Sequence, residues 1–210
     1  MVSQKAVSKV EGRIRSLREI EPSTRARELA AELDKDPALI ELVLQESAGV
    51  VRAERGVLIT ETRGGWVCAN AGIDSSNLPE GQVSLLPVDA DSSARLIRAE
   101  IGAVSGNAPA VVIADSFGRP WRLGQADIAI GCAGLAPLDD WRGRRDRQGN
   151  ELTATVIAVA DELAAAADLA REKDDGVPAV IISGLGDRIT AEDGPGAAVL
   201  RRAADEDLFR

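Results

Sequence analysis

The sequence lacks several residue types that common mechanisms need. It contains no histidine, which excludes a Ser–His or Cys–His nucleophilic dyad and any histidine metal ligand. Any chemistry must therefore depend on carboxylates, hydroxyls, amides, lysine and arginine. The only cysteines, Cys68 and Cys132, are too few for a disulfide framework and lack the spacing of a zinc site, so we expect both to be small buried hydrophobic residues.

Long apolar runs are also missing. No run approaches the roughly 18 residues that cross a bilayer, and the first residues do not show the charged, apolar and small segments of a secretory signal. We therefore expect a cytoplasmic protein that does not contact membranes.

Positive charge is in the minority, because 25 Lys and Arg face 34 Asp and Glu, for a formal net charge of −9. Such a chain is not typical of nucleic-acid binders, which carry a basic face, so we expect no nucleic-acid partner. Arginines nevertheless cluster between residues 119 and 147. A local basic cluster favours a small phosphorylated ligand, although neighbouring aspartates could simply neutralise it at the surface.

One stretch near the middle of the chain carries the strongest signal for a site. Residues 110–114 have the length and β-branched content of a buried strand, which we expect to end at Asp115 and Ser116. Ligands collect at the carboxyl ends of such strands. Asp115 and Ser116 offer hard oxygens to a divalent cation, and Arg119 and Arg122 offer forked donors to phosphate. A polar cap followed by two solvated arginines is the alternative, and these residues alone leave both open.

Helical spacing and capping residues predict four main helices. The first begins at residues 22–24, and the second has Asp36 as its N-cap with Pro37 in its first turn. A third opens at Asp89 and places its arginines on the solvent-exposed face. The longest signal, roughly residues 152–171, predicts the fourth.

Period-two alternation and apolar runs predict the strands. The segments are residues 2–10, 50–53, 57–61, 66–69, 110–114, 128–133 and 179–182. The second, third and fourth of these indicate an antiparallel meander. With the helices, they predict one domain, residues 1–210, of mixed α/β class.

A polar loop containing Asp74 and Asn77 follows the meander. Loops of this composition often make ordinary Asx turns. The functional interpretation is that Asp74 is a second hard ligand facing Asp115, while Asn77 bonds a nucleotide.

Seven blocks of the sequence are informative when taken together. They read VSQKAVSKVEGR, GVLITETRGGWVCANAGIDSSN, LLPVDADSSARLIR, IADSFGRPWRLGQADIAIGCAGL, LDDWRG, DRQGNELTATVIAVADELAAAADL and GVPAVIISGL. In this combination they resemble one family, the coenzyme F420-0:L-glutamate ligases, also called F420 γ-glutamyl ligases. The blocks cover nearly the whole chain in order. Seven blocks in register are far more specific than any one of them.

The resemblance implies a GTP-dependent ligase of coenzyme F420 biosynthesis. In the family, GTP phosphorylates the terminal carboxylate of F420-0, the amine of L-glutamate attacks the acyl phosphate, and GDP and phosphate leave. It also implies Mg²⁺ or Mn²⁺ as cofactor, two ions in number, with K⁺ as a further candidate. The lack of histidine agrees, because phosphoryl transfer depends on positioning and charge neutralisation more than on a protein nucleophile. The implied fold is mixed α/β, with largely antiparallel sheets and packed helices, assembled as an intertwined homodimer.

The resemblance also assigns site residues. The implied metal ligands are Asp74, Asp115, Ser116 and Glu172. The implied nucleotide contacts are Gln4, Lys5, Lys9, Asn77, Arg171 and Lys173, of which the first three lie on the family's N-terminal strand. Arg119 and Arg122 fit phosphate or coenzyme binding, and we take them as the catalytic arginines.

The chain departs from the family pattern at its ends. Family members usually carry about one βα unit before the block that begins at Val2, and that unit helps to hold GTP, so we expect a shortened N-terminus. The tail, residues 207–210, resembles actinobacterial members, some of which carry a reductase domain that we do not expect here. The alternatives are a shortened homologue that binds nucleotide or coenzyme without ligating and, from the acids and arginines alone, a metal-dependent phosphohydrolase.

Overall fold

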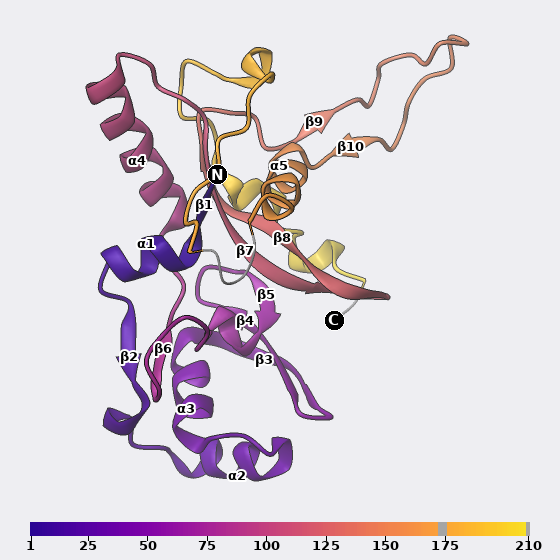
Figure 1. Ribbon diagram of the computed structural model, residues 1–210. Helices are drawn as coiled ribbons and strands as arrows, with labels where there is room; N and C mark the ends of the chain where they lie inside the picture. The colour runs from indigo at the N-terminus through magenta and orange to yellow at the C-terminus, as the bar shows by residue number, and fades with distance from the viewer. Residues whose placement is uncertain (172–175, 209–210) are drawn as a thin grey trace.

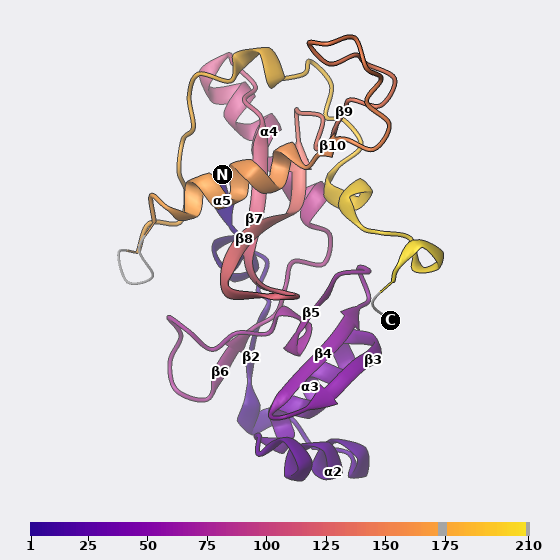
Figure 2. The same ribbon diagram turned by 90° about the vertical axis from the view of Figure 1, so that its right-hand side faces the viewer.

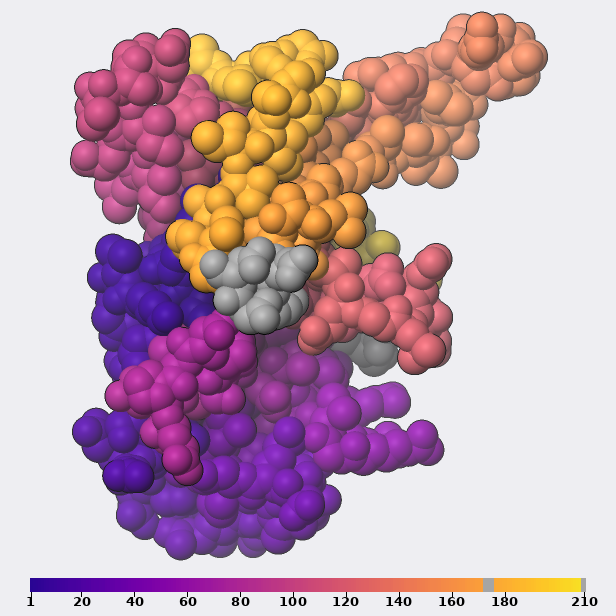
Figure 3. Space-filling view, viewed as in Figure 1, coloured from indigo at the N-terminus to yellow at the C-terminus, as the bar shows by residue number. Residues whose placement is uncertain are grey.

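A long antiparallel hairpin forms the centre of one half of the molecule (Figure 1). The computed structural model describes residues 1–171 and 176–208. In the hairpin, β7 (Val111–Arg119) pairs with β8 (Arg122–Ala133) along its whole length, and β1 (Val2–Ser3) adds in parallel beside β7. Figure 3 shows the hairpin tip projecting from the body of the molecule.

Two helices cover the opposite faces of this three-stranded sheet. α4 (Ala90–Ser105) packs on one face and α5 (Val159–Asp168) crosses the other (Figure 2). Successive residues of a strand point to opposite faces. Accordingly, Val111 and Ile113 pack in the cluster that contains α4, whereas Val112 packs in the cluster that contains α5.

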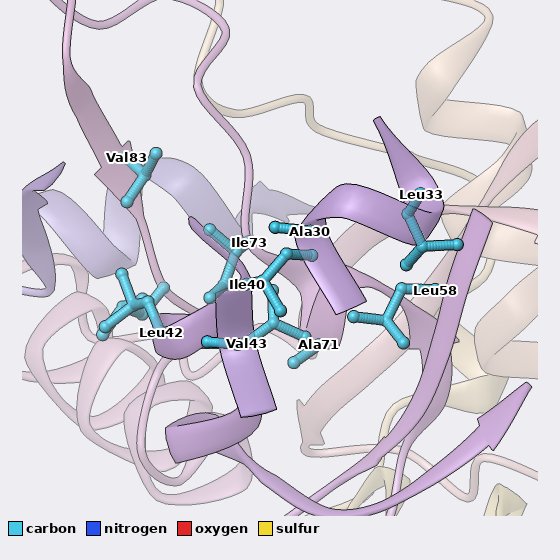
Figure 4. Close-up of a cluster of buried hydrophobic side chains, with 11 residues drawn as sticks. Ala30, Leu33, Ile40, Leu42, Val43, Leu58, Ala71, Ile73 and Val83 are labelled. Carbon is cyan, nitrogen blue, oxygen red and sulfur yellow. The ribbon is translucent and has the colours of Figure 1, made fainter. Parts of the chain in front are cut away.

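The other half consists of a helical pair on a small meander. α2 (Thr24–Leu33) and α3 (Pro37–Glu46) pack against the antiparallel strands β3 (Ser47–Glu54) and β4 (Val57–Thr62). The third strand of the meander, β5 (Val67–Ala69), pairs with β4. Figure 4 shows the apolar side chains between them, among which Ile40, Val43 and Leu58 are fully buried.

Short elements connect and flank the two halves. They are α1 (Gln4–Val10), the antiparallel pair β2 (Ile14–Ser16) and β6 (Gln82–Ser84), the antiparallel pair β9 (Asp139–Asp140) and β10 (Val156–Ile157), and the 3₁₀ turns η1 (Leu17–Glu19), η2 (Asn70–Gly72), η3 (Gly186–Arg188), η4 (Ala197–Leu200) and η5 (Ala204–Glu206). Over the described residues the sheets are small and mostly antiparallel, so the predicted mixed α/β class is confirmed. No helix in residues 1–171 or 176–208 is long and apolar enough to span a bilayer.

The predicted helix starts are confirmed where a local cap defines them. Ser23 accepts a hydrogen bond from the backbone N–H of Ala26, and Asp36 accepts one from that of Ala38, with Pro37 opening α3. Asp89 caps α4 in the same way. The antiparallel meander and the burial of both cysteines are also confirmed.

The prediction of a strand over residues 2–10 was wrong beyond Ser3. The segment turns into α1, whose buried residues Gln4, Val7 and Ser8 follow the i, i+3, i+4 spacing of a helical face. Gln4, Lys5 and Lys9 therefore lie on a helix.

Two further predictions placed helix or strand where the chain is irregular. The long helix begins only at Val159, because the preceding residues form β10 and pair with β9. Residues 179–182 form an isolated bridge from Ala179 to Val2 instead of a strand, with Val180 exchanging backbone hydrogen bonds with Met1.

The exposed face predicted for the arginines of α4 was wrong for Arg98, which is 8% exposed. Its guanidinium pairs with Asp193 at 2.7 Å and donates to the carbonyls of Pro109, Thr190 and Ala191. It therefore ties the segment after residue 186 to the sheet.

Candidate functional site

Eight of the predicted site residues line one cleft of about 690 Å³. They come from α1, from the loop after η2, from the middle of β7 and from the segment that follows α5. They are Gln4, Lys5, Lys9, Asp74, Asn77, Asp115, Ser116 and Arg171. The structure thus brings together segments that are far apart in the sequence.

Asp115 and Ser116 lie inside β7 and not at its end, which corrects the predicted strand boundary. The register of the hairpin shifts between Ile113 and Ala114, immediately before the two residues. β-Bulges of this kind bend a strand and re-aim its side chains, and they are frequent beside active sites. Asp115 and Ser116 therefore follow directly on an irregularity in the paired strands.

Asp115 is the most perturbed carboxyl group of the cleft. Burial raises the pKa of Asp115 to about 7, and the negative charges of Asp127 and Asp74 act in the same direction. Hydrogen bonds from the Ser116 backbone and the Gln4 side chain oppose the rise. A nearby cation would favour the ionised form of this carboxyl group.

Gln4 contacts Asp115 from within the protein. The Gln4 side chain is 2% exposed, and its Oε1 accepts a hydrogen bond of 3.0 Å from the buried Ser8 hydroxyl. This bond fixes the amide so that its N–H donates to Asp115.

Asp74 and Lys5 form the second charged pair of the cleft. Lys5 Nζ lies 2.5 Å from Asp74 Oδ2 and 2.8 Å from the Ser76 carbonyl oxygen. Burial alone would raise the pKa of Asp74, but hydrogen bonds from Lys5 and Ser76 hold it below its usual value. Lys9 reaches the same loop through the carbonyl of Asn77.

Asp127 is a cleft residue that sequence reasoning missed. It lies on β8, is 2% exposed, and accepts hydrogen bonds from Ser116 Oγ at 2.6 Å and from Arg171. The hairpin register pairs Ser116 directly with Asp127, so that correct strand pairing would have revealed it. Gln125 and Asp168 also line the cleft.

The predicted catalytic arginines lie at the hairpin turn, away from the cleft. Arg119 and Arg122 flank the turn of the hairpin, are exposed, and are not among the described residues that line the cleft. Arg119 donates to the carbonyl of Leu123 at 2.7 Å. Glu172 and Lys173 lie outside the described residues, so their predicted roles stay predictions.

The donor set of the cleft fits a hard divalent cation. Asp74 and Asp115 interact electrostatically, Ser116 adds a hydroxyl oxygen, and a cation would stabilise the ionised form of Asp115, whose pKa is raised. Over residues 1–171 and 176–208 there is no cluster of three His, Cys, Asp or Glu side chains able to hold a metal. Two carboxylates and a hydroxyl thus leave further coordination positions to water and phosphate, as is usual for Mg²⁺.

Comparison with known proteins gives the family of the chain. The family model described as F420-0:Gamma-glutamyl ligase matches residues 1–184 of the chain. The chain belongs to this family. The coenzyme F420:L-glutamate ligase of Methanothermobacter thermautotrophicus is 46% identical over 100% of this chain and 83% of its own length. Those of Methanopyrus kandleri and Methanocaldococcus jannaschii are 44% and 40% identical over the whole chain and 84% and 83% of their lengths.

The relatives named here are archaeal, and not actinobacterial as the tail of the chain had led us to expect. The identity extends over the whole chain, and the predicted family membership is therefore confirmed.

Proposed function

We propose that this chain is a GTP- and divalent-metal-dependent ligase that joins L-glutamate to the terminal carboxylate of coenzyme F420-0 in F420 biosynthesis. The observation that supports it most is the cleft that unites Asp74, Asp115, Ser116 and Lys5 in a member of this ligase family. The relatives named above carry the same activity in their names.

In the proposed reaction, an oxygen of the coenzyme carboxylate attacks the γ-phosphorus of GTP and GDP leaves. The amine of L-glutamate then attacks the acyl carbon, the amine loses a proton and inorganic phosphate leaves. Asp74, Asp115 and Ser116 would hold Mg²⁺ or Mn²⁺, which when bound neutralises phosphate charge. No protein nucleophile takes part.

The protein's own contribution is to position charge. Lys5 and Lys9 bring two ammonium groups to one wall of the cleft, where they favour binding of polyphosphate. Lys5 also fixes Asp74, and Gln4 fixes Asp115. Because Gln4 is buried, we assign it to holding Asp115 in preference to the nucleotide contact that the resemblance implies.

The proposal includes the homodimer, the single domain, a K⁺ site and a cytoplasmic location, which stay predictions. Light scattering of the purified chain tests the dimer, and a monomer mass contradicts it.

Phosphate release distinguishes the ligase from the alternatives. We expect GTP to yield phosphate rapidly only when F420-0 and L-glutamate are both present with Mn²⁺. Release from GTP alone at the same rate would favour a phosphohydrolase. If the chain binds GDP but releases no phosphate from GTP under any of these conditions, a homologue that does not ligate is favoured.

A further inference from the structure

The carboxylate of Asp127 joins two parts of the cleft that the family resemblance treats separately. Its Oδ1 accepts the hydroxyl of Ser116, a predicted metal ligand. Its Oδ2 accepts a guanidinium N–H of Arg171, a predicted nucleotide contact. Asp127 is almost wholly buried, so both bonds are shielded from water.

The bond to Ser116 determines what its hydroxyl can offer. A hydroxyl has one donor and two acceptor lone pairs. Since the Ser116 proton points to Asp127 at 2.6 Å, the oxygen can present lone pairs to the cleft that Ser116 lines. A cation requires that orientation of a hydroxyl ligand.

The bond to Arg171 holds a guanidinium group at the wall of the cleft. The Arg171 side chain is 10% exposed and lines the cleft, and its Nε–H is buried with no acceptor in the part of the chain that the structure describes. A buried, unpaired N–H of a charged group is unfavourable. The cost is offset if the Arg171 guanidinium, which lines the cleft, binds a phosphate group there.

We propose that Asp127 is a positioning residue that couples the metal and nucleotide halves of the site. One carboxylate oxygen turns Ser116 toward the cation, and the other holds the Arg171 guanidinium at the cleft wall, where it binds a phosphate group of the nucleotide. The inference rests on the proposed function. A purely structural Asp127–Arg171 ion pair is the competing explanation, and it predicts no effect on either ligand.

Binding titrations separate these explanations. Calorimetry with Mn²⁺ alone measures the affinity of the metal half of the site. Calorimetry with GDP at saturating Mn²⁺ measures the affinity of the nucleotide half. We expect Asp127→Asn to weaken Mn²⁺ binding by about 10-fold, the range found when partners of metal ligands are removed, and to weaken GDP binding by a similar factor.

Double variants show through which residue Asp127 acts. In a Ser116→Ala background, Asp127→Asn should no longer change Mn²⁺ affinity, and in an Arg171→Gln background it should no longer change GDP affinity. The inference is overturned if Asp127→Asn lowers the affinities as much in these two backgrounds as in the wild type. It is also overturned if a folded Asp127→Asn protein has unchanged affinities.

Two further proteins control for folding. Asp161→Asn changes a half-buried carboxylate that bonds the Ala129 backbone and is not among the described cleft residues, so both affinities should stay unchanged. If Asp127→Asn does not fold because Arg171 is left unpaired, Asp127→Asn with Arg171→Gln removes both charges. That double variant should lose the same factor of about 10 in Mn²⁺ affinity, whereas Arg171→Gln alone should lose none.

The two levels of the proposal fail differently. A wild-type chain that binds neither Mn²⁺ nor GDP overturns the proposed function and the inference together. A wild-type chain that binds both, beside an Asp127→Asn protein with unchanged affinities, overturns the inference alone.

Discussion

Asp115→Asn is expected to lower glutamyl transfer by about 100-fold or more while raising the thermal stability of the metal-free protein at pH 8. The activity falls because a ligand charge is lost. The stability rises because the pKa of Asp115 is about 7 in the folded chain against an ordinary value of 3.8. As pH rises from about 4 to about 7, the unfolded chain releases this proton and the folded chain keeps it, so the folded state loses stability.

The expected stabilisation is up to about 4 kcal/mol above pH 7, from roughly 1.4 kcal/mol per pKa unit. Asparagine stabilises the fold because a neutral amide is never ionised, so the cost of ionising Asp115 in the folded chain disappears. Thermal unfolding between pH 5 and pH 8.5 in EDTA measures the effect, which should vanish toward pH 4. Added Mn²⁺ should raise the melting temperature of the wild type and not that of the variant.

Asp74→Asn is the matched control. Hydrogen bonds from Lys5 and Ser76 hold the pKa of Asp74 below its usual value, so its charged form stabilises the fold above that value. This variant should therefore lower the melting temperature in EDTA. Destabilisation of both variants to a similar extent at pH 8 would contradict the described environment of Asp115.

Gly131→Ala is expected to destabilise the fold by about 3 kcal/mol or more, the upper range for overpacking. A Cβ at Gly131 would lie 2.3 Å from the carbonyl carbon and oxygen of Ala90. Those atoms belong to the backbone at the start of α4 and cannot rotate away, so the helix must move off β8. A fall in melting temperature of about 6 °C or more should result.

Gly118→Ala provides the comparison for this variant. Gly118 lies on the other strand of the same hairpin, and a Cβ there would have no atom within 4 Å. Its melting temperature should stay close to that of the wild type. Equal melting temperatures of the two variants in thermal unfolding would show that α4 does not pack as closely on β8 as described.

Local features were predictable from the sequence, because a cap needs only a few neighbouring residues. Ser23 and Asp36 bond to backbone groups two or three residues away, and the helices begin where they indicate. Residues 2–10 were predicted wrongly because a short apolar pattern fits a strand and a helix alike. The buried face of α1 is short, and it is defined by packing in the folded chain, which the sequence alone does not give.

The site shows the same limit. Asp74, Asp115 and Ser116 could be named from motifs, whereas Asp127 could not, because its role depends on which β8 residue pairs with Ser116. Arg119 and Arg122 were predicted to join the acids since they follow closely in sequence. β7 continues past Ser116, however, so that Arg119 at its end and Arg122 at the start of β8 lie at the tip of the hairpin.

The most direct test of the proposed ligase is the mass of the coenzyme after reaction. The purified chain is incubated with F420-0, GTP, L-glutamate and Mn²⁺, beside the Asp115→Asn and Asp161→Asn proteins. We expect a glutamyl mass increment with the wild type and Asp161→Asn, and none above background with Asp115→Asn. An unchanged coenzyme mass with the wild type, or an equal yield with Asp115→Asn, would contradict the assignment of ligase chemistry to this cleft.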